Sequence, residues 1–302
     1  MPVLNDVLLE EAINNEWIIN ANKQNIQPAS IDLTLSDKIW ERSYQSPLFN
    51  FNHLRRLREK NPILYKNKIY VAELNESADL PSHLFGMFST KSSIGRLGAL
   101  ISVLTEEGGL YNTASFGYRG KLYAEIVPLT FDIQFHQDDA ITQIRLMTDD
   151  TVICCDKFDI DISEYYRSLS LCNDYVNTRQ KNDPQLFFDH ITNNTEPVHL
   201  FKNELCLISS VQEISLPDYV CATVGEFEPI FGEFRIHFAG FIDPGFSHSK
   251  IVLEILPTYH NIRFKNSSFF VKYHPLIEPA KKLYGQRNNH YQSQRLKLSK
   301  FF

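Results

Sequence analysis

Two stretches of the sequence concentrate residues that could do chemistry. The first runs from Gly240 to Phe246 and delivers Asp243 at the end of an apolar approach, just before a Pro-Gly turn. The apolar run that follows, residues 251–256, is interrupted by one carboxylate, Glu254. Because side chains alternate between the faces of a strand, Glu254 shares a face with apolar neighbours. A carboxylate there is costly, so Glu254 is either held in a structural ion pair or used in the chemistry.

The second stretch, residues 89–98, packs cations, hydroxyls and glycines together. It contains Lys91, Ser92, Ser93 and Arg96. Hydroxyls, backbone N–H groups and a lysine are the groups that bind phosphate. The order of residues is not that of a P-loop, because the Gly-x-x-x-x-Gly-Lys pattern is absent. The stretch is therefore a candidate phosphate site, and the alternative is a polar surface turn.

Composition and charge exclude several classes of protein. The chain has 302 residues and a formal net charge of −6, which argues against non-specific nucleic-acid binding. No apolar run has the length of a membrane span, and the N-terminus lacks a signal-peptide pattern, so a cytoplasmic location is expected. The five cysteines are irregularly spaced without a Cys-x-x-Cys pair, which predicts neither a disulfide framework nor a zinc site. The Pro-Cys-x-x-Cys signature of zinc deaminases is missing too.

The pattern of apolar residues predicts a mainly β fold. Short apolar runs rich in Phe and Tyr are bounded by Asn, Asp, Gly, Ser or Pro, as strands are. A short N-terminal helix is expected after a cap at Asn5 or Asp6. Residues 40–66 are basic and irregular and are predicted to be a loop of undefined role. The acidic residues between Asp149 and Ser163 are expected to connect two domains.

An internal repeat supports two domains, residues 1–158 and residues 159–302. Residues 117–128 recur as residues 245–257, and each copy places a glutamate three residues before a proline. These glutamates are Glu125 and Glu254. Two tandem copies of one strand-rich domain explain this pattern better than one large sheet.

The two copies differ where chemistry would occur. The Lys-Ser-Ser cluster occurs only in the first half, and the Ile-Asp-Pro-Gly stretch occurs only in the second. In the region of the first half that corresponds to Ile-Asp-Pro-Gly, the sequence has residues 106–111. Each copy keeps what the other lacks, which predicts one composite site, formed within one chain or between chains. Ordinary drift of a duplicated scaffold is the alternative.

Together these motifs resemble the dCTP deaminase branch of the dUTPase-like superfamily, in its long tandem-domain bacterial form. Residues 27–33 are similar to the family's first motif, and residues 91–98 to its phosphate-binding and catalytic motif. Residues 239–246 with Glu254 resemble its nucleoside motif and catalytic glutamate, and residues 284–294 its C-terminal tail. The resemblance implies a distorted β-barrel or jelly roll in each half. It also implies zinc-independent hydrolysis of dCTP to dUTP and ammonia.

The resemblance assigns roles to residues of this chain by motif match. The implied catalytic residues are Glu254, Arg96 and Ser92. The implied substrate-binding residues are Lys91, Ser92, Ser93, Arg96, Ala239, Asp243, Tyr291 and Gln294. His290 stands where the family usually has a lysine before the tail tyrosine, and a neutral histidine would bind phosphate less strongly.

Partners and alternatives follow from the same resemblance. It implies dCTP and dUTP as ligands and dTTP as a feedback inhibitor. It implies no zinc, and Mg²⁺ that is carried with the triphosphate and coordinated mainly by phosphate and water. It also implies that the protein forms a homo-oligomer. One alternative is a dUTP diphosphatase, or a bifunctional enzyme that produces dUMP, with Asp243 orienting the attacking water. Another is an inert nucleotide-binding module. Glu254 favours deamination, because a pure diphosphatase needs no carboxylate near C4 of the base.

Overall fold

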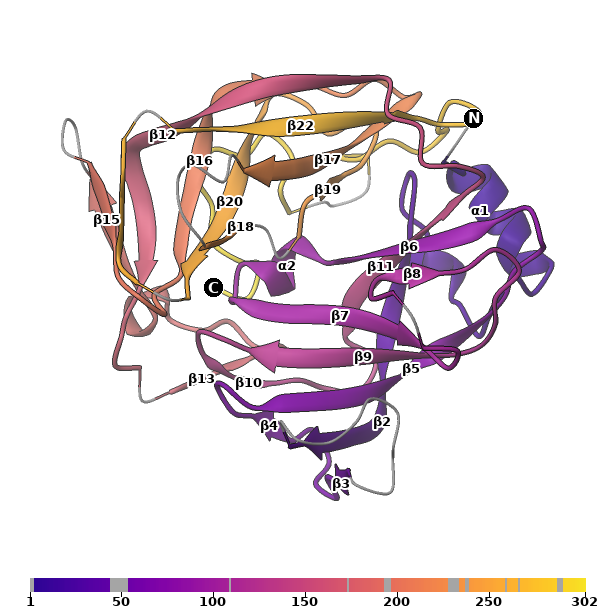
Figure 1. Cartoon of the computed structure of the whole chain (residues 1–302), viewed down its shortest axis with the longest axis horizontal. Coiled ribbons are helices and arrows are strands. Elements are labelled where there is room, and N and C mark those ends of the chain that lie inside the picture. The colour runs from indigo at the N-terminus through magenta and orange to yellow at the C-terminus, as the bar shows by residue number, and fades with distance from the viewer. Residues whose placement is uncertain are drawn as a thin grey trace.

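The computed structural model describes most of the chain and shows two β-rich halves packed against each other (Figure 1). The described residues are 3–43, 54–108, 110–172, 174–192, 197–227, 234–236, 239–258, 260–265, 267–286 and 290–302. In Figure 1 the indigo-to-magenta half lies below and the pink-to-yellow half above. The end of the chain lies beside the short helix α2 of the first half.

The elements of the two halves follow in chain order. The first half contains α1 (Asp6–Asn14), β1 (Ile18–Ile19), η1 (Lys23–Asn25), β2 (Ile31–Arg42), β3 (Arg55–Arg56), β4 (Ile63–Leu64), β5 (Ile69–Asp79), β6 (Phe85–Thr90), α2 (Ser92–Gly95), β7 (Ala99–Thr105), β8 (Thr113–Ala114), β9 (Arg119–Pro128), β10 (Asp132–Gln134) and β11 (Ala140–Met147). The second half contains β12 (Cys154–Ser168), β13 (Tyr175–Asn177), η3 (Pro184–Leu186), β14 (Phe188–Thr192), β15 (Val198–Leu200), β16 (Cys206–Ile214), β17 (Val220–Phe227), β18 (Phe234–Ile236), β19 (Phe241–Ile242), β20 (Ser249–Pro257), β21 (Ile262–Phe264) and β22 (Ser268–Pro275).

Each half is built on one curled sheet, and the two sheets have the same strand order. The first sheet runs β7-β9-β5-β2-β11-β6-β8, and the second runs β18-β20-β16-β12-β22-β17-β19. Neighbouring strands along both paths are antiparallel. The mainly β prediction with one short N-terminal helix is confirmed. Asn5 caps that helix, because its side chain accepts a hydrogen bond from the Leu8 N–H at 3.0 Å.

The internal repeat is visible in matching turns of the two halves. Asn67 and Asn203 both adopt positive φ, 62° and 64°, which asparagine tolerates better than most residues. The N–H of Asn67 donates to the Pro128 carbonyl at 2.8 Å, and that of Asn203 donates to the Pro257 carbonyl at 2.8 Å. The same hydrogen bond therefore joins equivalent strands in both copies.

The acidic stretch expected as a connection is divided in the structure: Asp149 and Asp150 lie between β11 and β12, whereas residues 156–163 belong to β12. Cys154 to Asp159 pair with β22, and the following residues pair with β16, so the whole strand belongs to the second sheet. Phe158 and Ile160 are buried between more exposed neighbours, which is the pattern of a strand with one solvent face. The linker prediction was therefore wrong for residues 156–163, where Asp159 and Asp161 alternate with the buried Phe158 and Ile160. The proposed domain limit between residues 158 and 159 falls inside this strand and stays a prediction.

Residues 40–66 are only partly a loop. Strand β2 continues to Arg42, and the short strands β3 and β4 follow in the later part of the stretch. Strand β3 pairs with β2, and β4 pairs with β10. The remaining residues, 44–53, lie outside the described part of the chain.

The core explains how the halves face each other. Alternate residues of β20 pack into two different hydrophobic cores. The core of the second half contains Ile251, Leu253 and Ile255. The larger core, centred on the first half, contains Val252 and Leu256. Glu254 lies on the same face as the latter pair. The strand thus directs this carboxylate toward the first half of the chain.

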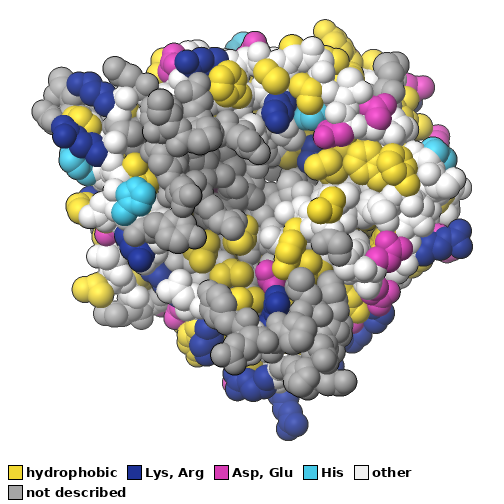
Figure 2. All heavy atoms as spheres, in the orientation of Figure 1, with side chains coloured by type: hydrophobic (Ala, Val, Ile, Leu, Met, Phe, Trp, Pro, Cys, Tyr) yellow, Lys and Arg dark blue, Asp and Glu magenta, His cyan; other side chains and the backbone are white. Residues whose placement is uncertain are grey.

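None of the described helices combines the length and hydrophobicity that a bilayer crossing requires. On the face shown in Figure 2, hydrophobic side chains are interspersed with charged and neutral ones.

Candidate active site

A pocket of about 230 Å³ lies between the two halves of this single chain. Eight of the nine predicted site residues line it: Lys91, Ser92, Ser93, Arg96, Ala239, Asp243, Tyr291 and Gln294. Four of them come from the first half and four from the second. The prediction of a composite site is therefore consistent with the geometry, and the groups meet within one chain.

The Lys91-to-Arg96 stretch forms the pocket wall of the first half. Strand β6 ends at Thr90, Lys91 caps the one-turn helix α2, and Arg96 follows it. The Lys91 Nζ lies 2.5 Å from the Asp32 Oδ2, and the Gln27 side-chain amide donates to the same oxygen at 3.2 Å. Asp32 thus positions Lys91, a role that its place in the Gln-Pro-Ala-Ser-Ile-Asp motif did not reveal.

Arg96 is the most heavily contacted cation of the site. Its side chain is 3% exposed. Its Nη1 donates to the Lys297 carbonyl at 2.7 Å and its Nη2 to the Gln294 Oε1 at 3.0 Å. The guanidinium lies over the Tyr291 ring, 4.0 Å from the centroid. All three partners belong to the C-terminal tail, so this segment holds Arg96 against the pocket.

Glu254 sits behind Arg96. Its Oε1 lies 4.0 Å from the Arg96 Nε, and the side chain is 1% exposed. Glu254 is absent from the described pocket lining, whereas Val252, on the same face of β20, contributes to it. The two hypotheses for this carboxylate are therefore compatible: it is ion-paired, and its partner lines the pocket.

The repeat supplies a natural comparison for Glu254. Glu125 on β9 pairs in register with Val71, as Glu254 on β20 pairs with Leu207. Glu125 is ion-paired with Arg42. The copies thus keep the glutamate and pair it with different arginines. Of these two ion pairs, the Glu254–Arg96 pair, which joins the two halves, is the one that includes a residue lining the pocket.

Asp243 occupies the end of β19 and faces the pocket. It is 8% exposed and accepts a hydrogen bond from the Ala29 N–H at 3.3 Å. Burial, and then repulsion by Asp32, raise the pKa of Asp243 to about 7. Near neutral pH this carboxyl can therefore be present in both protonation states, able to donate as well as accept a hydrogen bond.

Strand pairing shows which residue of the first half corresponds to Asp243, and it differs from the predicted one. Ala114 on β8 pairs with β6 as Ile242 on β19 pairs with β17. Ser115 therefore occupies the position of Asp243, and the predicted counterpart, residues 106–111, was wrong. The register of the sheet decides this correspondence.

The tail closes one side of the pocket. The Gln294 backbone N–H donates to the Ser249 Oγ at 3.3 Å, and its side-chain amide donates to the Lys250 carbonyl at 2.9 Å. Desolvation and then the Lys297 cation lower the pKa of His290 to about 4. His290 is therefore neutral at pH 7, as the sequence comparison anticipated.

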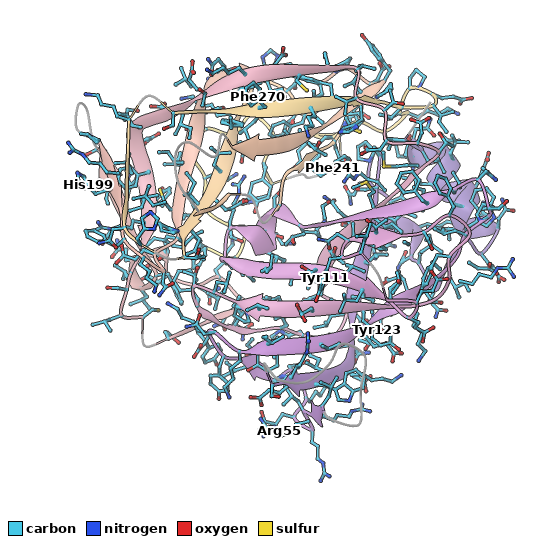
Figure 3. All side chains as sticks on the ribbon, in the orientation of Figure 1. Arg55, Tyr111, Tyr123, His199, Phe241 and Phe270 are labelled. Carbon is cyan, nitrogen blue, oxygen red and sulfur yellow. The ribbon has the colours of Figure 1, made fainter. Side chains whose placement is uncertain are left out.

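Several lining residues were missed by reasoning from sequence. They are Gln27, Gln143, Tyr284 and Lys300 among others. Gln27 precedes the proline of the first motif, and Lys300 belongs to a basic run near the end of an acidic chain, so each carried a weak signal. Figure 3 shows Phe241, another lining residue, at the side of the second half that faces β6 and α2.

The duplicated β fold and the pocket between its copies, which is lined by three cations among the described residues, are suited to an anionic ligand such as a nucleotide. Comparison with family models gives the family. The 2′-deoxycytidine 5′-triphosphate deaminase N-terminal domain matches residues 2–150, and the C-terminal domain of the same family matches residues 166–302. The chain belongs to the 2′-deoxycytidine 5′-triphosphate deaminase family.

A solved structure agrees with this assignment at the level of the fold. The chain is similar to 2′-deoxycytidine 5′-triphosphate deaminase from Agrobacterium tumefaciens, with a TM-score of 0.84 and 23% sequence identity. The match covers 92% of this chain and 99% of the other. No match was found among the curated proteins. The family makes the chain an enzyme that deaminates dCTP, and it does not favour the diphosphatase alternative.

Proposed function

We propose that this chain deaminates dCTP in the pocket between its halves, with Glu254 as the group that moves the protons. The observation that carries the proposal is the buried Glu254–Arg96 pair, 4.0 Å apart, whose arginine lines a pocket rich in phosphate-binding groups. A buried carboxylate next to a cation is suited to exchange protons with a reacting group. The roles below extend this proposal.

The reaction needs two proton transfers and no oxidant. A water held beside Arg96 and Ser92 gives a proton to Glu254 while its oxygen bonds to C4 of cytosine, and Glu254 passes that proton to N3. The second water proton then moves through the same carboxylate to the amino group. The C4–N bond breaks, and ammonia leaves with its electron pair. Since Arg96 lines the pocket and lies 4.0 Å from Glu254, the arginine would orient the water and keep the carboxylate in reach.

Substrate binding is assigned to the remaining lining residues. Lys91, Ser92 and Ser93 would bind phosphate oxygens, and the backbone at Ala239 would contact the base. Asp243 would hold the 3′-hydroxyl of the deoxyribose, for which a carboxyl with a raised pKa can donate or accept. Tyr291 and Gln294 would cover the triphosphate side through the tail.

Magnesium is proposed to enter with the nucleotide. Mg²⁺ keeps several waters and is usually held by one or two carboxylates together with phosphates. Among the described residues that line the pocket, Asp243 is the one carboxylate, and cations face the same space. These residues fit an ion carried mainly by the triphosphate, whose charge it would partly neutralise.

Four further points remain proposals. dTTP shares the deoxyribose and triphosphate of dCTP, so it would compete for the same pocket and act as an inhibitor. The dUTP product would be released without cleavage to dUMP. The chain would form a homo-oligomer, which sedimentation would test. A cytoplasmic location is also proposed.

A coupled assay on the purified protein with dCTP and Mg²⁺ tests the proposal. Ammonia is followed enzymatically, and the nucleotides are separated by chromatography. Ammonia together with dUTP supports it, and adding dTTP to the same assay measures inhibition. Ammonia with dUMP would show a bifunctional enzyme, and dCTP binding without ammonia would refute deamination.

A further inference from the structure

We propose, on the basis of the proposed function, that Lys300 binds the triphosphate of dCTP and that a latch formed by Lys181, Asn182 and Phe302 holds it in place. Lys300 lies ten residues beyond His290 and lines the same pocket. It would supply the positive charge that a neutral His290 does not.

The backbone of Lys300 is fixed on both sides. Its N–H donates to the Tyr291 hydroxyl at 3.1 Å, and its carbonyl accepts from the Lys181 Nζ at 2.7 Å. The neighbouring Ser299 hydroxyl donates to the Ser93 carbonyl at 2.6 Å. Lys300 is therefore tied directly to the ring that covers Arg96 and, through its neighbour Ser299, to the phosphate-binding stretch.

The last residues are held by a second set of contacts. Asn182 donates to the Phe301 carbonyl from its backbone N–H at 2.8 Å and from its side chain at 2.9 Å. The Phe302 ring contacts the rings of Phe187 and Phe188, with centroids 5.3 Å and 5.4 Å apart. These contacts give the tail an apolar end that packs against the core.

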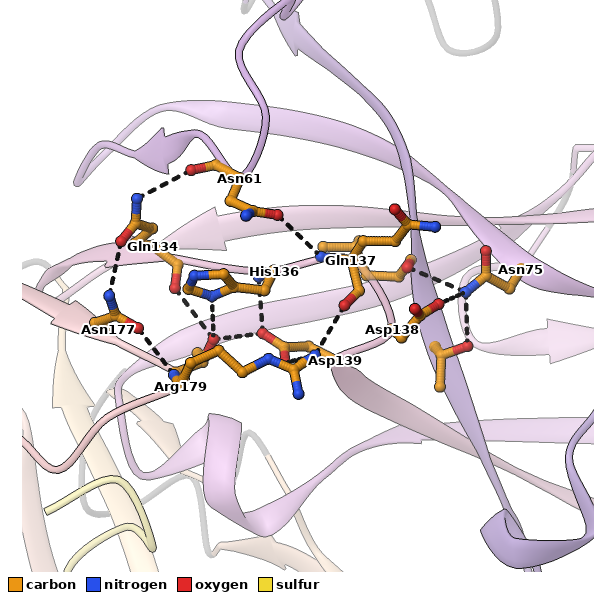
Figure 4. A network of polar contacts seen from close by, with 12 residues as sticks. Asn61, Asn75, Gln134, His136, Gln137, Asp138, Asp139, Asn177 and Arg179 are labelled. Atoms are coloured by element: carbon orange, nitrogen blue, oxygen red, sulfur yellow. Dashed lines mark hydrogen bonds and ion pairs between the residues drawn. The ribbon is translucent and has the colours of Figure 1, made fainter.

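The segment that carries the latch is itself anchored to the first half (Figure 4). Strand β13 pairs in parallel with β10, and the Asn177 side chain donates to the Gln134 Oε1 at 2.8 Å. Arg179 forms an ion pair with Asp139 at 3.0 Å and donates to the Gln137 carbonyl at 2.8 Å. The latch thus connects the end of the second half to a rigid edge of the first.

Charge gives Lys300 a ligand of defined chemistry. The cations among the described lining residues are Lys91, Arg96 and Lys300. Desolvation, and then repulsion by Lys91, lower the pKa of Lys300. Lys91 repels Lys300, whereas Asp32 and Asp139 attract it, and both lysines line the same pocket. An anion with several charges, such as a triphosphate, would relieve this repulsion.

The test compares Lys300→Gln with Arg295→Gln. Arg295 is on the same tail, is ion-paired with Glu213 at the surface and is absent from the described lining, so both variants lose one positive charge. We expect Lys300→Gln to raise the KM for dCTP about tenfold or more with kcat within about twofold. Lys300→Arg should restore most of the affinity, and Phe302→Ala should raise KM as Lys300→Gln does.

Calorimetry with dCTP and dCMP separates the possible failures. Lys300→Gln should weaken dCTP binding and leave dCMP binding near the wild-type value. Equal effects on both nucleotides, or no difference from Arg295→Gln, would overturn the inference. If the wild-type protein released no ammonia, the proposed function would fail, and the two affinities would still report whether Lys300 binds phosphate.

Discussion

Replacing Glu254 by glutamine tests whether its carboxylate does chemistry or only balances charge. The substitution keeps the size of the side chain and removes the charge and the proton-accepting oxygen. Proton transfer by a positioned group is worth about 10²–10⁴ in rate, or about 3–5 kcal/mol in the barrier. We therefore expect kcat to fall by at least about 100-fold while dCTP still binds.

The same substitution also costs stability, which must be measured separately. Two charges 4.0 Å apart attract by about 4 kcal/mol at an effective dielectric constant of 20. Removing one partner of a buried ion pair typically costs about 3–5 kcal/mol, because the other charge is left uncompensated, although Arg96 keeps its bonds to Lys297 and Gln294. Urea unfolding gives this number.

Glu125→Gln is the matched control, because Glu125 has the equivalent strand position and its own arginine partner, Arg42. Both variants should lose stability, and only Glu254→Gln should lose turnover. The assay is ammonia release from dCTP at saturating substrate, with binding followed by calorimetry. If Glu254→Gln turned over dCTP at nearly the rate of Glu125→Gln, Glu254 would not be the proton-transfer group.

Three further predictions follow from the site. The pKa of Asp243 is raised to about 7 in the folded protein, so the folded protein keeps a proton there that the unfolded chain has released, and this group makes stability fall as pH rises from about 4 to 7. Asp243→Asn should remove that fall, so that the stability of the variant relative to wild type is higher at pH 8 than at pH 5 by about 1–4 kcal/mol. Urea unfolding at both pH values measures this difference, and an unchanged pH dependence would contradict the prediction. Arg96→Lys should lower kcat/KM about 100-fold, because lysine cannot make both hydrogen bonds and stack on Tyr291, whereas Arg295→Lys should have little effect in the same kinetic assay. Chelating Mg²⁺ with EDTA should raise the KM for dCTP and leave the Tm of the nucleotide-free protein unchanged. A lowered Tm would instead indicate an ion bound by the protein itself.

Local patterns were sufficient for much of the fold. Alternating and short apolar runs predicted the strands, and the Asn5 cap predicted helix α1. The repeated Glu-x-x-Pro pattern predicted the duplication, since equivalent positions in two copies of a sheet need the same residue types. The linker prediction was wrong for residues 156–163, because exposed acids within a strand look like a connection when the pairing partner is unknown.

Local sequence patterns predicted only part of the candidate site. The sequence by itself determined which residue types could bind phosphate and move protons, because the chemistry of Lys91, Ser92, Arg96 and Glu254 does not depend on the fold. Only the tertiary structure decided that Arg96 forms an ion pair with Glu254, although 158 positions of the sequence separate them (254 minus 96). It also decided that Asp32 forms an ion pair with Lys91, and that the last residues of the chain contact the first half. These contacts arise from the packing of two sheets, and no local sequence pattern encodes a contact between surfaces so far apart along the chain.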